Sequence, residues 1–94
     1  MKKLFYTVLT YDGEYGGDQW SSYCGNSHEK ALDAYKEAQE NIERELESKV
    51  YKTGYSMTAV LTAYDFENED EFNECDDLES HRKWEKEKVI LKKS

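Results

Sequence analysis

The pattern of hydrophobic and polar residues predicts two strong strands and one long helix. Lys3 to Tyr11 (KLFYTVLTY) is rich in β-branched and aromatic residues and is followed by Asp12-Gly13, which is typical of a strand that ends in a turn. Ser56 to Phe66 (SMTAVLTAYDF) has the same character. From His28 to about Lys49, apolar residues recur every three or four positions, and this spacing predicts an amphipathic helix.

Weaker patterns complete the order of elements. Gln19 to Cys24 resembles a second strand that forms a hairpin with the first, and Lys88 to Lys92 resembles a last strand. Asn26-Ser27 offers an N-cap for the helix, with Glu29 placed to answer Asn26. Whether Leu78 to Glu87 forms a short helix stays open on the sequence. The sequence therefore predicts one α+β domain over residues 1–94, with the order β-β-α-β-(α)-β and the long helix packed on an antiparallel sheet of three to four strands.

Composition supports a folded chain and limits its partners. Only 37% of the 94 residues are hydrophobic and the formal net charge is −8, which leans toward disorder, but 14% of the residues are aromatic, and this favours a folded chain. No apolar run approaches the length of a membrane span or a signal peptide, so we expect a cytoplasmic protein with reduced cysteines. Negative charge disfavours direct binding to nucleic acid or to an anionic membrane, and it favours a basic protein as partner.

An acidic segment, residues 65–80, dominates the charge pattern. It holds nine acidic residues and no basic one, whereas residues 81–94 hold six basic and two acidic residues. One interpretation is internal neutralisation, with the basic C-terminal strand lying beside the acidic segment. The other is that the carboxylates are presented to a basic partner. Both interpretations stay open on the sequence.

The spacing within the acidic segment suits presentation in two conformations. A continued strand would project Asp65, Glu67, Glu69 and Glu71 from one face, whereas a helix would place Glu67, Asp70, Glu71, Glu74 and Asp77 on one face. Either arrangement presents anions much as a phosphate backbone does. In size and charge the chain is similar to small acidic phage inhibitors of the anti-restriction and anti-CRISPR type, and this resemblance implies a non-catalytic inhibitor that blocks a basic nucleic-acid-binding nuclease or effector.

The predicted partner-binding residues follow from this hypothesis. They are Asp65, Glu67, Glu69, Asp70, Glu71, Glu74, Asp76 and Asp77, together with Tyr15 in the glycine-rich turn between the first two strands. Tyr11, Trp20 and Tyr23 also lie near that turn, and Tyr11 and Trp20 are expected to pair across the hairpin.

The sequence also allows three alternatives to the inhibitor hypothesis. The first is a small bacterial or phage interaction domain that homodimerises through its sheet, with the acids serving only solubility. The second is a zinc site formed by Cys24, His28, Cys75 and His81, whose mixed pairs depart from the usual Cys-Cys and His-His spacing. The third is catalysis, for which no phosphate loop, nucleophile elbow or metalloprotease motif is present. We therefore expect no enzyme activity and no cofactor.

Overall fold

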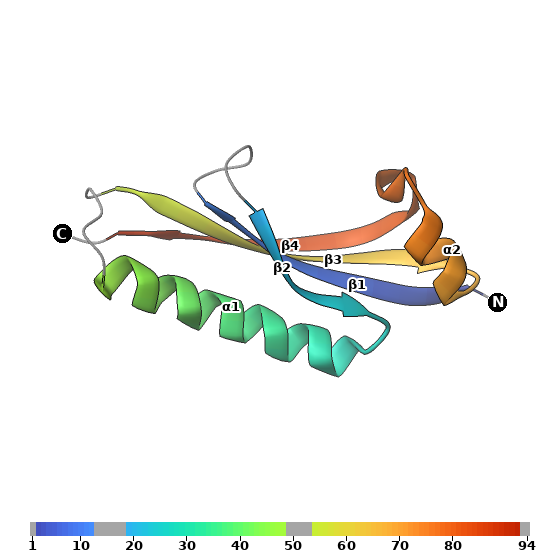
Figure 1. Ribbon diagram of the computed structural model, residues 1–94, viewed down its shortest axis with the longest axis horizontal. Coiled ribbons are helices and arrows are strands. Elements are labelled where there is room, and N and C mark those ends of the chain that lie inside the picture. Colours follow the sequence, from blue (N-terminus) through green and yellow to red (C-terminus); the bar gives the residue numbers. More distant parts are fainter. Residues whose placement is uncertain (1, 13–18, 49–53, 93–94) are drawn as a thin grey trace.

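The computed structural model describes residues 2–12, 19–48 and 54–92. Within these ranges four strands form one antiparallel sheet in the order β2-β1-β3-β4. Its members are β1 (Lys3–Asp12), β2 (Gln19–Gly25), β3 (Ser56–Phe66) and β4 (Arg82–Leu91). The long helix α1 (His28–Ser48) packs on one face of the sheet, as Figure 1 shows. The predicted α+β class and the order of elements are confirmed.

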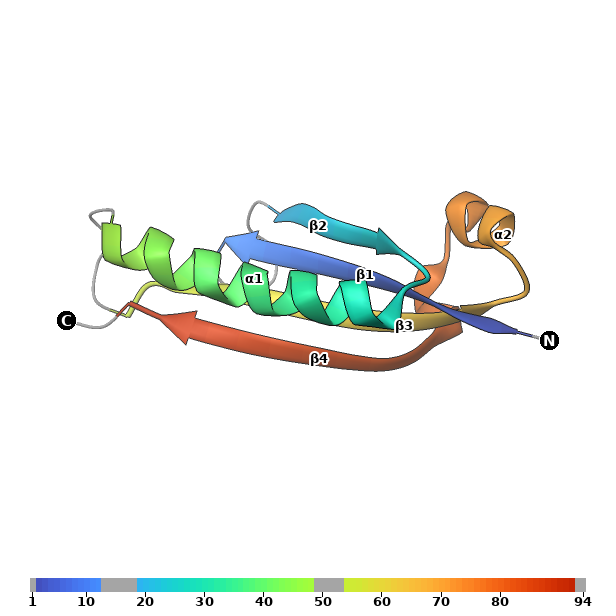
Figure 2. The same cartoon turned by 90° about the horizontal axis from the view of Figure 1, so that it is seen from below.

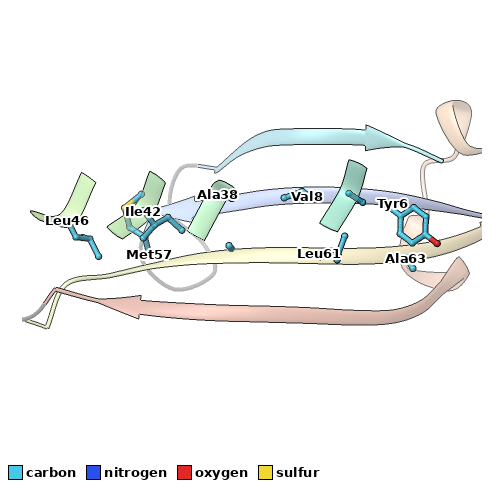
Figure 3. Close-up of a cluster of buried hydrophobic side chains, with 10 residues drawn as sticks. Tyr6, Val8, Ala38, Ile42, Leu46, Met57, Leu61 and Ala63 are labelled. Carbon is cyan, nitrogen blue, oxygen red and sulfur yellow. The ribbon is translucent and has the colours of Figure 1, made fainter. Parts of the chain in front are cut away.

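The main hydrophobic core lies between α1 and the sheet. Figure 2 shows that α1 lies along the length of the sheet, close to the direction of the strands. Its apolar stripe meets small and aliphatic side chains of β1 and β3 (Figure 3), because alternate residues of a strand point to the same face. The buried members of this cluster are Tyr6, Val8, Ala31, Ala38, Ile42, Leu46, Met57, Ala59, Leu61 and Ala63.

A second, smaller cluster lies on the opposite face of the sheet. Phe5 of β1, Phe66 of β3 and Phe72 of the short helix α2 (Glu69–Glu74) are each at most 5% exposed and pack together. Tyr64, Cys75 and Leu78 pack around them, the last from the 3₁₀ helix η1 (Leu78–His81). The sheet therefore has α1 on one face, and the acidic segment lies on the opposite face, at one end of the sheet (Figure 1).

The entry to α1 depends on a close approach at Gly25. The Ser27 amide donates to the Tyr23 hydroxyl (3.0 Å), and the Ser27 hydroxyl accepts from the Lys30 amide (3.2 Å). A Cβ atom at position 25 would lie 2.6 Å from the Tyr23 hydroxyl, so only glycine leaves room for this arrangement. Ser27 is the residue that caps the helix, and the predicted pairing of Glu29 with Asn26 places the cap one residue too early.

The C-terminal third differs most from the sequence prediction. β4 begins at Arg82 rather than at Lys88, and only Leu78–His81 is helical within the candidate helix over residues 78–87. In β4, Lys86 and Lys88 lie opposite Leu61 and Ala59 on the α1 side of the sheet. An edge strand tolerates this pattern because lysine can bury its stem and keep its ammonium group in water, so the strand has no continuous hydrophobic signal.

Candidate functional site

The acidic segment folds as a short capped helix followed by a turn. The Asn68 side chain accepts a hydrogen bond from the Glu71 amide (2.9 Å), and the Glu71 carboxylate accepts one from the Glu67 amide (3.3 Å). Glu69, Asp70 and Glu71 occupy the first turn of α2, where negative side chains interact favourably with the helix dipole. The dense acidic composition is therefore compatible with a helix that begins at this position.

A single aromatic side chain anchors α2 to the sheet. The Phe72 ring stacks on the Phe5 ring, with 5.0 Å between centroids, and meets the Phe66 ring edge-on at 5.5 Å. Phe72 is 5% exposed, whereas the other residues of α2 are exposed. Since successive residues of a helix are about 100° apart, Asp70 and Glu74 lie opposite Phe72 and point away from the sheet.

The structure brings most of the predicted partner-binding residues to one end of the molecule. Glu69, Asp70, Glu71 and Glu74 are exposed on α2, with Glu67 exposed before it and Asp76 and Asp77 exposed after it. Asp65 is half-buried near the end of β3. The continued-strand arrangement is wrong because β3 ends at Phe66, and the helical arrangement applies to the three members of its set that lie in α2.

The basic C-terminal strand lies beside β3 rather than beside the acidic segment. Its residues pair with Ser56 to Tyr64. Where the two regions meet, the Lys83 ammonium group lies 3.4 Å from the Asp65 carboxylate. Among the described residues, no ion pair involves the following exposed acids of the segment: Glu69, Asp70, Glu74, Asp76, Asp77 and Glu79. In the described residues, the basic side chains of β4 therefore do not neutralise the acidic segment one for one.

A shallow hollow opens between α2 and η1. Its lining consists of Phe66, Glu71, Glu74, Cys75 and His81. The His81 ring stacks on the Phe66 ring with 4.3 Å between centroids, so the imidazole forms part of the floor. The hollow combines two carboxylates with an aromatic surface, which suits a cationic side chain better than an anion.

The four residues of the candidate zinc set are divided between the two faces of the sheet. His28 contacts the rings of Tyr6 and Trp84 on the α1 side, whereas Cys75 and His81 lie with α2 and η1 on the other side. In residues 2–12, 19–48 and 54–92, no group of three or more metal-binding side chains comes together. The geometry gives the zinc hypothesis no support.

The Cys24 thiol is exposed on β2, near the acidic segment. Partial burial, and to a smaller extent the Glu69 carboxylate, raise the pKa of this thiol above its ordinary value. Both effects disfavour the thiolate, which is the form that attacks electrophiles and binds metals. Cys24 and Cys75 are both free thiols.

The aromatic residues near the hairpin turn are arranged differently from the prediction. Tyr15 lies outside the described residues. Trp20 pairs with Thr10, and Tyr11 pairs with Gln19, so the two rings lie on opposite faces of the sheet and the predicted cross-hairpin aromatic pair is wrong. Trp20 is 48% exposed, on the same side as α1.

Two surface features of the protein do not follow from the sequence pattern. The hollow around His81 depends on the docking of α2, which the ambiguous pattern of residues 70–87 did not reveal. Val89 and Leu91 at the end of β4 are 42% and 56% exposed, although a run of apolar residues in a strand usually predicts burial.

Fold and surface together define a small α+β domain with one helix on a four-stranded antiparallel sheet and an acidic helix on the other face. Comparison of the chain with protein-family models, with curated proteins and with solved structures finds no match in any of the three. Among the described residues, no helix has both the length and the apolar character needed to cross a membrane.

Proposed function

We propose that the protein is a non-catalytic, cytoplasmic binding domain whose acidic segment engages a basic protein. The observation that carries this proposal is the outward presentation of Asp70 and Glu74 from a helix held by Phe72. These carboxylates have no ion-pair partner among the described residues. Crowded like charges weaken the folded state, and a cationic partner would relieve that cost.

The partner class follows from the spacing of the charges. Asp70 and Glu74 are one helical turn apart, so their Cβ atoms are about 5–6 Å from each other. This separation is of the same order as the spacing of phosphates along a nucleic-acid strand. A protein with a cationic nucleic-acid channel attracts such a surface through the same Coulombic term that attracts DNA. The specific form of the proposal is therefore an inhibitor that occupies the nucleic-acid site of a nuclease or effector complex.

The hollow beside α2 adds a feature that supports a protein partner. Glu71 and Glu74 stand at its rim and the Phe66 and His81 rings lie in its lining. Arginine and lysine side chains interact favourably with both carboxylates and aromatic faces. An arginine from the partner's nucleic-acid site would fit this combination.

The test is inhibition of DNA cleavage by a panel of restriction enzymes and CRISPR effector complexes at increasing salt. We expect inhibition of at least one of them, weakening as salt rises because the exposed charges are screened. A four-fold variant (Glu69→Gln, Asp70→Asn, Glu71→Gln, Glu74→Gln) should lose inhibition and keep its fold by circular dichroism.

A matched control removes the same charge from α1. The variant Glu29→Gln, Asp33→Asn, Glu40→Gln, Glu47→Gln changes four exposed acids on the other face of the sheet. We expect this control to inhibit as the unmodified protein does. Equal loss in both variants would mean that net charge alone matters, and inhibition that is independent of salt would end the mimicry proposal.

A further inference from the structure

The two edges of the sheet differ in regularity. The edge strand β2 contains an irregularity in its pairing with β1, between Val8 and Leu9. The pairing of β4 with β3 is irregular only near Arg82 and is continuous from Trp84 to Leu91. Within the described residues, β4 is the last strand of the sheet and has no neighbour on its outer side. β4 therefore offers the longer regular edge for pairing with another strand.

Hydrogen bonds at the end of β4 show which backbone groups face outward. The Lys92 amide donates to the Tyr55 carbonyl (2.7 Å), and the Lys92 carbonyl accepts from the Gly54 amide (3.1 Å). Lys92 therefore directs both backbone groups toward the chain that leads into β3. Because this direction alternates along an antiparallel strand, Leu91 and Val89 direct theirs toward the free edge. The same two residues have exposed apolar side chains.

The charges of β4 restrict how two copies of this edge can pair. Glu85 and Glu87 lie on one side of the sheet, and Lys86 and Lys88 lie on the other. In a two-fold antiparallel pair that continues the sheet, opposed residues lie on the same side. Pairing centred on Lys86 or Glu87 therefore sets glutamate against glutamate and lysine against lysine, which is destabilising. These charges protect the first part of the edge from self-association.

A pairing centred on Ile90 avoids most of this repulsion. It sets Val89 of one copy against Leu91 of the other and Ile90 against Ile90, so apolar side chains meet. The remaining like-charged contact sets Lys88 against Lys92, and Glu43 of α1 lies beside both of these residues, because it lines the hollows next to each of them. Lys92 is also fixed, since its ammonium group donates to the Leu46 carbonyl at the end of α1 (2.5 Å).

We propose that two copies of the chain associate through the C-terminal ends of their β4 strands, in antiparallel register about a two-fold axis at Ile90. The pairing joins the two sheets and covers the exposed side chains of Val89 and Leu91. It lies at the opposite end of the long axis from α2 (Figure 1), so a dimer presents its two acidic segments at its far ends. The proposal is independent of the function of the acidic segment.

Light scattering over a range of protein concentrations tests the association. We expect a concentration-dependent dimer, and a Val89→Glu, Leu91→Glu variant that stays monomeric throughout the range. Leu4→Glu, which places one added carboxylate on another exposed apolar residue away from this edge, should dimerise as the unmodified chain does. A monomer at every concentration, or a dimer that survives the double substitution, would overturn the proposal.

Disulfide crosslinking tests the register. In a background of Cys24→Ser and Cys75→Ser, Ile90→Cys should crosslink two copies under oxidation, because residues opposed in a non-hydrogen-bonded pair have Cα atoms about 4.5 Å apart. Lys86→Cys is the control on the same side of the strand, and it should remain uncrosslinked. A dimer that crosslinks through position 86, or through neither position, would contradict this register. The α2 charge variant should dimerise normally, which separates this result from the inhibition test.

Discussion

The helices α1 and α2 are both acidic, yet they are held to the sheet in different ways. α1 has seven acidic and three basic residues over its length, and four of its side chains are buried in the main cluster. α2 has four acidic residues among six and buries Phe72 alone. The acidic side chains of α1 are therefore positioned by the packing of the main hydrophobic core. The positions of the acidic side chains of α2 depend on the packing of Phe72 alone.

Removing a buried side chain of α1 should destabilise the whole domain. Ile42 is 2% exposed in the main cluster, so Ile42→Ala should lower the free energy of unfolding by about 2–5 kcal/mol, through lost burial and the cavity that remains. Urea unfolding measures the change. Leu4→Ala, at a residue that is 38% exposed, is the control and should change stability much less. Equal losses in both variants would show that α1 is not the main source of stability.

Removing the Phe72 side chain, which anchors α2 to the sheet, should destabilise α2 and its surroundings and not the whole domain. Phe72→Ala should cost about 3 kcal/mol, near the lower end of the usual range for a buried phenylalanine, and it should release residues 69–81 while the main core stays folded. Amide hydrogen exchange should therefore accelerate in that segment, with Asn73→Ala on the exposed side of α2 as the control. A cooperative loss of protection in α1 as well would mean that the two clusters unfold as one unit.

Removing the cap of α2 should have a smaller effect confined to its first turn. Asn68→Ala deletes the acceptor for the Glu71 amide and should destabilise α2 by about 1 kcal/mol. Asn68→Asp keeps an acceptor at this position and should preserve most of the stability. The measurement is exchange of the Glu71 amide. Unchanged exchange in Asn68→Ala would show that Phe72 alone holds the helix.

Raising the pH above about 10 should lower the free energy of unfolding slightly, through ionisation of Tyr35. Burial, and to a smaller extent Glu87, raise the pKa of Tyr35 above its ordinary value of 10.0. The folded chain then holds the Tyr35 proton more tightly than the unfolded chain, so this contribution is present below about pH 10 and is lost as pH rises further. Tyr35→Phe should reduce the fall of the unfolding free energy in that range. If the unfolding free energy of Tyr35→Phe falls as steeply as that of the unmodified chain, other groups cause the decrease.

The sequence predicted the parts of the fold whose periodicity comes from a large buried face. α1 and β3 were predicted almost to the residue, because each packs on the main core and repeats its apolar positions accordingly. The elements within residues 70–87 were not predicted from the sequence, because α2 buries only Phe72 and β4 is an edge strand with lysines on the α1 side. A pattern of hydrophobic residues cannot identify an element that buries so little.

The class of fold, the order of the main elements and the concentration of carboxylates in residues 65–80 follow from the sequence alone. The tertiary structure decided where that charge goes. Pairing of β4 with β3 takes most of the terminal lysines away from the acidic segment, and the stacking of Phe72 on Phe5 turns Asp70 and Glu74 toward solvent. The physical reason is that local spacing sets which residues share a face, whereas contacts between distant segments set what that face meets.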